Sequence, residues 1–183
     1  FFLFCLIWIS LLGFASPLLL ISGILFGKWI GTFISVVSIS IGALILYSIV
    51  GFFFKDLVSR LLEKKFLKYI HLFRKNEFNY FLAFRLVGGL GIPFGPQNVL
   101  PVVFNMKKSN YFFASFLGFV PHFFIWNTIG SGINNYIAES DKFSLLTFVL
   151  SKEIYIPLIS FFIFILISLF LRNKIFFEKN KNE

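Results

Sequence analysis

The sequence predicts an all-α polytopic membrane protein in which transmembrane helices are combined with two opposed re-entrant helical hairpins. Hydrophobic residues make up 58% of the chain and charged residues only 14%, and the mean hydropathy is +0.88, which excludes a soluble globule. Arg85 stands inside an apolar stretch, directly before the helix-breaking run 88–96. At bilayer depth a charge is costly, and non-helical backbone is tolerated only where it is buried in protein or lines a wet cavity. We therefore expect this segment to build a site within a single membrane domain, over residues 1–172.

The first expected hairpin covers about residues 1–28. One leg runs over 1–12, a breaker over 13–17 and a second leg over 18–27, with Lys28 and Trp29 suited to a membrane interface. A crossing follows over about 32–54, because residues 34–54 carry no charge and approach the roughly 20 residues that a bilayer requires. Small residues in this crossing allow close contact with a neighbouring helix.

Residues 55–79 form a basic stretch with apolar residues at three-and-four spacing. Two interpretations remain open: an amphipathic helix on an anionic cytoplasmic leaflet, or a solvated connecting helix that obeys the orientation rule. The formal charge of +9 arises mostly from basic residues that flank apolar segments, where membrane orientation is a sufficient reason for them. We therefore expect no nucleic acid as a partner.

The positively charged residues after residue 106 indicate whether residues 80–106 cross the membrane or form a re-entrant hairpin. If they crossed the membrane, Lys107 and Lys108 would lie outside, and so would the basic tail, which violates the positive-inside bias twice. A re-entrant hairpin over about 80–106 leaves both groups on the cytoplasmic side. Two crossings then follow, over about 109–136 and 154–171, and residues 173–183 form a polar cytoplasmic tail.

The two hairpins would enter the membrane from opposite sides, as in inverted-repeat transporters whose broken helices meet near the midplane. Gly42 follows Pro17 at the same distance as Gly118 follows Pro93, which is a weak repeat signal. The residues that we expect to break helices, kink them or permit close approach are Pro17, Gly23, Gly27, Gly88, Gly89, Gly91, Pro93, Pro96, Gly118 and Pro121.

Arg85 is the leading candidate for binding substrate. Its guanidinium stays charged and offers a planar fork of donors that suits a phosphate. The alternative is that Arg85 caps exposed carbonyl groups at the broken tip of the hairpin. Ser22, Gln97 and Asn98 are further candidates, able to bind a head group or to bond free backbone groups. His122 is a candidate proton relay because it titrates near neutrality, although a lone histidine more often holds a packed, hydrogen-bonded position.

Enzymatic chemistry has little support in the sequence. It contains no cluster with metal-ligand spacing, no nucleophile elbow and no phosphate-binding loop, so we expect neither catalytic residues, nor a metal, nor a cofactor. Cys5 is the single cysteine and excludes an intrachain disulfide. The chain begins at Phe1 rather than methionine, so we expect either that residues precede it or that a leader has been removed.

Two groups of residues resemble a known family. The first is Pro17-x4-Ser22-Gly23-x-Leu25-Phe26-Gly27-x3-Gly31 with Gly42-Ala43 and Tyr47; the second comprises Phe84-Arg85-Leu86, Ile92-Pro93-Phe94, Asn98, Gly118, Pro121 and Gly130. Both resemble signatures of the SNARE-associated Golgi protein family, whose shared module is the VTT domain of the DedA superfamily. The resemblance implies a membrane protein with two opposed re-entrant hairpins. It also implies a role in moving lipids, since several relatives are implicated as scramblases in eukaryotes or as carriers of undecaprenyl phosphate in bacteria.

The sequence departs from the family pattern at two places. Gly88 stands where relatives often have a proline, and Leu18 and Leu19 follow Pro17 where the DedA branch has acidic residues. The second departure argues against the proton-coupled mechanism of that branch. The leading hypothesis is a flippase- or scramblase-type transporter of lipids or lipid phosphates, with anionic phospholipid or polyprenyl phosphate as partner, in a bacterial inner (plasma) membrane. The alternatives are a non-transporting scaffold for envelope integrity or protein sorting, and a small-solute or ion transporter.

Overall fold

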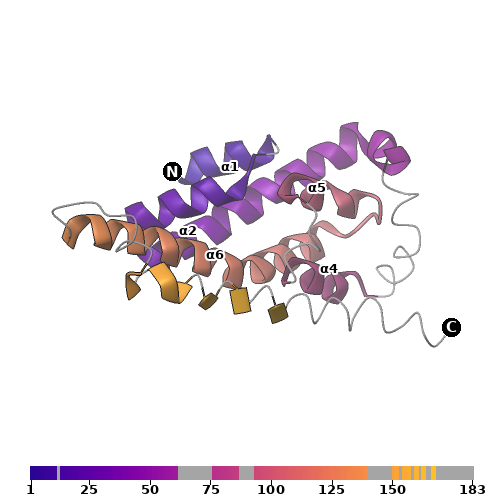
Figure 1. Cartoon of the computed structure of the whole chain (residues 1–183). Coiled ribbons are helices and arrows are strands. Elements are labelled where there is room, and N and C mark those ends of the chain that lie inside the picture. The colour runs from indigo at the N-terminus through magenta and orange to yellow at the C-terminus, as the bar shows by residue number, and fades with distance from the viewer. Residues whose placement is uncertain are drawn as a thin grey trace, which may run out of the picture. The chain divides into compact units, whose positions relative to one another are not determined.

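The computed structural model describes residues 1–11, 13–61, 76–86, 93–139, 150–152, 154–157, 159–160, 162–163 and 166–167. Within these ranges every regular element is a helix, which confirms the all-α prediction for this part of the chain. The elements in order are α1 (Phe2–Ser10), α2 (Ala15–Phe53), α4 (Glu77–Leu86), α5 (Phe94–Val99), the short 3-10 helix η2 (Leu100–Val102) and α6 (Lys108–Glu139) (Figure 1).

Helices α2 and α6 are long and apolar enough to cross a membrane, judged by length and composition. The crossings expected over 32–54 and 109–136 fall within them. With 39 residues, α2 would measure roughly 58 Å if it were straight, about twice the hydrocarbon thickness of a bilayer. It is broken at Gly27, where φ is +73° and ψ is 176°, a conformation that glycine adopts without steric cost.

The chain forms two compact units. Unit 1 comprises Phe1–Ala15 and Val36–Phe119, and unit 2 comprises Ser16–Ser35 and Val120–Glu183. Both α2 and α6 therefore contribute residues to each unit. The legs expected for the first hairpin are divided between the units, whereas α4 and α5, on the legs expected for the second hairpin, both belong to unit 1. The re-entrant geometry and the inverted repeat remain predictions.

In unit 1, α1 packs against the second part of α2 through one narrow face. Cys5 and Ile9, one helical turn apart, are both completely buried. A Cβ placed on Gly42 would lie 2.8 Å from the carbonyl oxygen of Leu6, so this contact brings backbone against backbone. Ser10 strengthens the contact, because its hydroxyl lies 2.7 Å from the Leu6 carbonyl oxygen and 3.4 Å from that of Gly42.

In unit 2, the break at Gly27 turns α2 back on itself. The Ser22 hydroxyl donates a hydrogen bond to the carbonyl oxygen of Gly31, at 3.0 Å, and so ties the two sides of the break together. The contact with α6 is equally close, because a Cβ on Gly23 would lie 2.2 Å from the carbonyl oxygen of Asn127. Helices approach so closely only where small residues line the contact, as is common inside membranes.

Many large apolar side chains are exposed on these helices. Phe52 is 82% exposed, Leu11 77%, and Leu3 and Trp29 71% each. Together with the two helices of crossing length, this exposure indicates a membrane protein.

Several predictions fall wholly or partly outside the described residues. Residues 55–61 of the predicted basic helix are helical, and residues 62–75 lie outside the description. The tail 173–183 and the glycines Gly88, Gly89 and Gly91 also lie outside it. In the crossing expected over 154–171, the described residues are helical. Pro121 lies inside α6.

Candidate functional site

The candidate site is built in unit 1 around the last turn of α4. Glu77 fixes the beginning of this helix: its carboxylate accepts hydrogen bonds from the backbone N–H of Lys107, at 3.2 and 3.3 Å, and from the side-chain amide of Asn110, at 2.6 Å. Because Asn110 lies in the first turn of α6, these bonds attach α4 to the start of α6. Arg85 then falls at the other end of α4, where it is only 3% exposed.

A glycine on α6 permits the close approach of Arg85. A Cβ placed on Gly118 would lie 2.4 Å from the Cβ of Arg85, far inside the contact distance of two carbon atoms. Any larger residue at 118 would therefore push α4 away. The two attachments, at Glu77 and at Gly118, hold α4 against α6 along its length.

Prolines position the other side of the site. Pro93 has φ −55° and ψ 150°, so the chain is extended immediately before α5, and Pro96 lies in the first turn of this helix, where its missing N–H costs no helical hydrogen bond. Gln97 and Asn98 follow at once. Asn98 is completely buried and Gln97 nearly so, at 9% exposure.

The guanidinium of Arg85 donates hydrogen bonds to three uncharged side chains. Nη1 donates to Gln97 Oε1 at 3.3 Å, and Nη2 donates to Asn98 Oδ1 at 2.7 Å and to the Tyr111 hydroxyl at 3.2 Å. Its central carbon lies 4.7 Å from the ring centres of both Phe81 and Phe119, and 5.7 Å from that of Tyr111, within the range of cation–π attraction. These contacts bring Arg85, Gln97 and Asn98 together as neighbours.

The hydrogen bonding of this cluster is incomplete. Among the described residues, neither the Nε of Arg85 nor the Nδ2 of Asn98 has a hydrogen-bond partner, and no carboxylate pairs with the guanidinium. A buried charge that lacks a counter-charge is costly, and so is each buried donor that lacks an acceptor. Chemically, the cluster can therefore accept an anion with several acceptor oxygens.

The predicted alternative for Arg85 was the capping of backbone carbonyl groups. Within the described part of the chain, each of its hydrogen-bond acceptors is a side-chain oxygen. The expected tip of the hairpin is the run 88–96, of which the structure describes only residues 93–96. The capping of carbonyl groups at the tip therefore stays a prediction.

Tyr111 is the member of the cluster that sequence reasoning missed. Its side chain is completely buried. It stacks on Tyr47, with ring centres 4.6 Å apart, and on Phe81, at 5.2 Å. Its hydroxyl has three alternative acceptors at 3.3 to 3.4 Å: the carbonyl oxygens of Ala43 and Asn98 and the Asn98 side-chain oxygen. A tyrosine at the start of a crossing is typical of a membrane interface, so its position in the sequence did not indicate a contact with Arg85.

Ser22 and His122, the other predicted site residues, belong to unit 2. The Ser22 hydroxyl is engaged with Gly31, as described above. The indole N–H of Trp126 donates to Nε2 of His122 at 3.1 Å, which requires this imidazole nitrogen to be an unprotonated acceptor. The described residues contain no group of three or more histidine, cysteine, aspartate or glutamate side chains that could hold a metal ion.

One comparison with known proteins bears on this site. The family model described as the VTT domain matches residues 14–132. This range contains Ser22, His122 and the guanidinium cluster, which consists of Arg85 and its hydrogen-bond partners Gln97, Asn98 and Tyr111. No solved structure matches the chain significantly.

Proposed function

Because the chain belongs to the VTT domain family, within the DedA superfamily of membrane proteins, we propose that it moves lipids or lipid phosphates across a bilayer, in the manner of a flippase or scramblase. In this proposal Arg85 binds the phosphate of the head group. Gln97, Asn98 and Tyr111 hold the guanidinium in place, and Asn98 offers a second donor to the same phosphate.

The observation that carries this proposal is a buried guanidinium whose partners among the described residues are all neutral. Arginine offers five N–H donors, and the three hydrogen bonds to Gln97, Asn98 and Tyr111 use three of them. The Nε of Arg85 and the Nδ2 of Asn98 remain as donors. A phosphate supplies both the missing negative charge and several acceptor oxygens, and it matches the planar fork of arginine.

The aromatic rings around the guanidinium also suit this role. Phe81, Phe119 and Tyr111 lie against it and form surroundings of low dielectric constant, in which the attraction between a cation and a phosphate is stronger than in water. Anionic phospholipids and polyprenyl phosphates both present such a phosphate, so both are proposed substrates. We further propose a bacterial inner membrane as the location of the protein. The distribution of lysine and arginine supports a cytoplasmic side for the basic stretch and the carboxyl end.

One observation favours a second candidate. Arg85 is 3% exposed and already held by three hydrogen bonds, which is also how a guanidinium would serve as a purely structural crosslink between α4, α5 and α6. Under this alternative the protein is a non-transporting scaffold for envelope integrity or protein sorting. A transporter of small solutes or ions would use the same donors for a soluble anion.

The test is head-group exchange in proteoliposomes, with a fluorescent phospholipid and with a polyprenyl phosphate. The native chain is compared with Arg85→Ala and Arg85→Lys at matched reconstitution, and Lys107→Gln, which removes an exposed charge outside the cluster, is the control. We expect exchange by the native chain and by the control. Exchange should fall in both Arg85 variants, because lysine keeps the charge but loses the fork.

Size-exclusion chromatography and circular dichroism establish whether each variant is folded. If folded native protein exchanges neither lipid, lipid transport is wrong, and the scaffold or a soluble substrate takes its place. If both Arg85 variants lose folded protein, the residue is a structural crosslink.

A further inference from the structure

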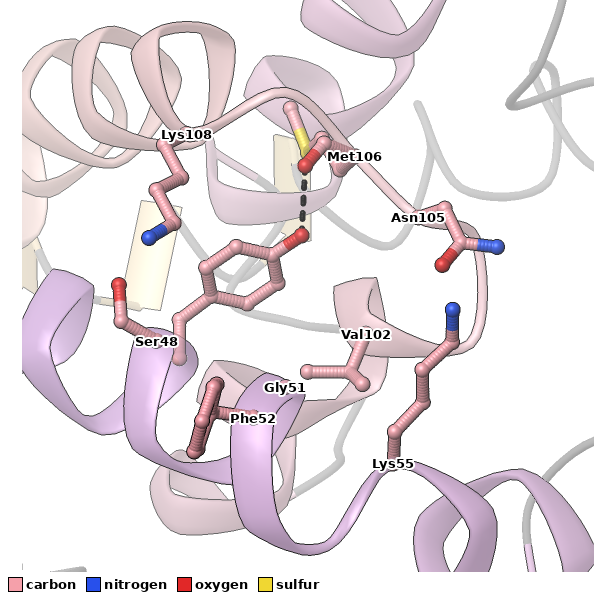
Figure 2. A pocket seen from close by; sticks show the side chains of 9 residues that line it. Ser48, Gly51, Phe52, Lys55, Val102, Asn105, Met106 and Lys108 are labelled. Carbon is pink, nitrogen blue, oxygen red and sulfur yellow. Dashed lines mark hydrogen bonds between the residues drawn. The ribbon is translucent and has the colours of Figure 1, made fainter.

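Unit 1 contains a pocket of about 310 Å³ where α2 ends and α6 begins (Figure 2). It is lined by residues of the last turns of α2, by Lys55 just beyond α2, and by the segment from η2 to the first residue of α6. It shares no residue with the direct partners of the Arg85 guanidinium. It is therefore a separate feature of unit 1.

The walls of the pocket are held by specific backbone contacts. The segment after η2 closes with the hydrogen bonds of a Schellman turn, Asn105 N–H to Val102 carbonyl at 3.1 Å and Met106 N–H to Pro101 carbonyl at 3.3 Å. Asn105 takes the left-handed conformation that this turn requires, with φ 51°. The Tyr47 hydroxyl donates to the carbonyl oxygen of Met106, which ties this segment to α2.

The floor of the pocket is apolar, and space remains above α2. A Cβ placed on Gly51 would meet only Val102 Cγ2, at 4.0 Å, an ordinary contact distance. Phe52 and Val102 supply apolar surface beside Gly51 (Figure 2). The pocket can therefore hold the apolar part of an amphiphile as well as a polar group.

Two ammonium groups stand at opposite ends of the pocket. Figure 2 shows Lys55 reaching up beside Asn105 at one end and Lys108 beside Ser48 at the other. The carboxylate of Glu77, also near the start of α6, is taken up by Lys107 and Asn110 and does not line the pocket. The first N–H groups of α6, a 32-residue helix that begins at Lys108, add partial positive charge. The charge at both ends favours an anion.

The position along the helices places the pocket at the level of lipid head groups. Phe52 and Phe53, at the end of α2, are 82% and 70% exposed, and the charged residues Lys55 and Asp56 follow immediately. Such a change from exposed aromatic rings to charge marks where a helix leaves the hydrocarbon region. A lipid phosphate lies at this level, whereas its acyl chains lie beside the exposed phenylalanines.

We propose that this pocket binds the head group of an anionic phospholipid from the adjacent leaflet, with Lys55 and Lys108 as cationic groups on either side of the head group and Ser48 and Asn105 as hydrogen-bonding groups. The apolar side chains Phe52 and Val102 contact the glycerol and the upper acyl chain. This inference rests on the membrane placement of the chain and does not require that the protein transports lipid.

The test measures binding of phosphatidylglycerol to the full chain in a non-ionic detergent by native mass spectrometry, with zwitterionic phosphatidylcholine as the comparison lipid. Lys55→Gln/Lys108→Gln is set against Lys107→Gln/Lys152→Gln, which removes the same charge from exposed lysines outside the pocket. All variants are made in both the native and the Arg85→Lys background, so that binding at the guanidinium is separated from binding in the pocket.

Each lysine near a lipid phosphate is expected to contribute about fivefold in affinity, so the pocket variant should bind phosphatidylglycerol about 25-fold more weakly, and the control within about twofold of the native chain. Gly51→Leu, which keeps every charge but fills the pocket, should also lose binding. Circular dichroism confirms that each variant is folded.

The inference would be overturned by equal weakening in the pocket and control variants, by equally tight binding of phosphatidylcholine, or by unchanged binding in Gly51→Leu. Inorganic phosphate is the competing probe for a soluble anion. Full displacement of the lipid by millimolar phosphate would also contradict a lipid head-group site.

Discussion

Both units of this protein bring a broken helical segment close to α6 at a glycine, but unit 1 adds a polar cluster to that contact. In unit 1, α4 and α5 meet α6 through a polar cluster, in which Arg85 contacts Gln97, Asn98 and Tyr111. In unit 2, residues 16–35 meet α6 through glycine, because Gly23 leaves no room for a side chain beside Asn127. The polar contact leaves donors over for a ligand, whereas the glycine contact leaves no space for one.

The predicted site residues of the two units also differ in whether their polar atoms already have hydrogen-bond partners. The Ser22 hydroxyl in unit 2 donates to the Gly31 carbonyl across the break at Gly27. In unit 1, the Nε of Arg85 and the Nδ2 of Asn98 lack partners among the described residues. Polar residues that looked alike in the sequence thus differ: some bond the backbone, and others keep hydrogen-bond donors for a ligand.

The largest expected effect breaks the glycine contact of unit 2. Gly23→Leu should prevent correct folding or lower the free energy of unfolding by about 3 kcal/mol or more, because any side chain there meets the backbone of Asn127. Thermal unfolding in detergent, followed by circular dichroism, measures it. Gly51→Ala is the matched control and should unfold like the native chain, since the added Cβ meets only Val102 at 4.0 Å. A Gly23→Leu protein as stable as the control would contradict the proposed packing.

The next effect weakens the polar contact of unit 1. Tyr111→Phe keeps the ring stacking but removes a hydroxyl that accepts from Arg85, so the free energy of unfolding should fall by about 2 kcal/mol, the range for hydrogen bonds to charged groups. Tyr47→Phe, which removes a neutral hydrogen bond from the stacked partner, should cost about 1 kcal/mol. Chemical denaturation of both variants gives the comparison. Equal costs would mean that the Tyr111 hydroxyl does not stabilise the guanidinium.

Arg85→Lys tests whether the polar contact does more than hold helices together. The exchange rate in proteoliposomes should fall about tenfold or more, corresponding to about 1.4 kcal/mol, while the yield of folded protein stays close to native. The assay is the head-group exchange described above. Native exchange from this variant would remove the guanidinium from the transport path.

The smallest effect is expected from Ser22→Ala. Loss of the hydrogen bond to Gly31 should lower the free energy of unfolding by about 1 kcal/mol, because this bond is neutral and local. Exchange should stay within about twofold of native when the reconstituted amounts are matched. A large loss of exchange in a folded Ser22→Ala protein would place Ser22 among the substrate contacts and erase the contrast between the units.

The sequence predicted the helical class and the composition of the site better than the contacts within it. The absence of charge over residues 34–54 indicated a crossing, which corresponds to the second part of α2, and the crossing expected over 109–136 corresponds to α6. The joining of residues 15–53 into one long, broken helix was not predicted. Arg85 was recognisable because a charge in an apolar stretch needs a reason. Gln97 and Asn98 were recognisable because they follow the proline-rich break directly.

The role of Tyr111 could not be read from the sequence, because it depends on which helix face meets Arg85. The same limit applies to Ser22, whose acceptor is the Gly31 carbonyl across a break that is visible only in the φ of Gly27. Lys55 and Lys108 were interpreted as orientation signals, and their common pocket arises only once the chain after η2 folds against the end of α2. Hydropathy and charge indicate which segments are helical and on which side of the membrane their ends lie. Contacts between helices depend, in addition, on how each helix is rotated about its own axis.

The single thiol of this protein has a practical value for mapping it. Cys5 is completely buried between α1 and α2, with Ser38 as a hydrogen-bonding neighbour, so water-soluble maleimides should not reach it in the folded protein. The native chain therefore behaves as a cysteine-free background without any change to its packing. New cysteines at exposed positions such as Lys107 and Lys152 can then be labelled from one side of intact cells, which reads out directly which face of the membrane each segment occupies.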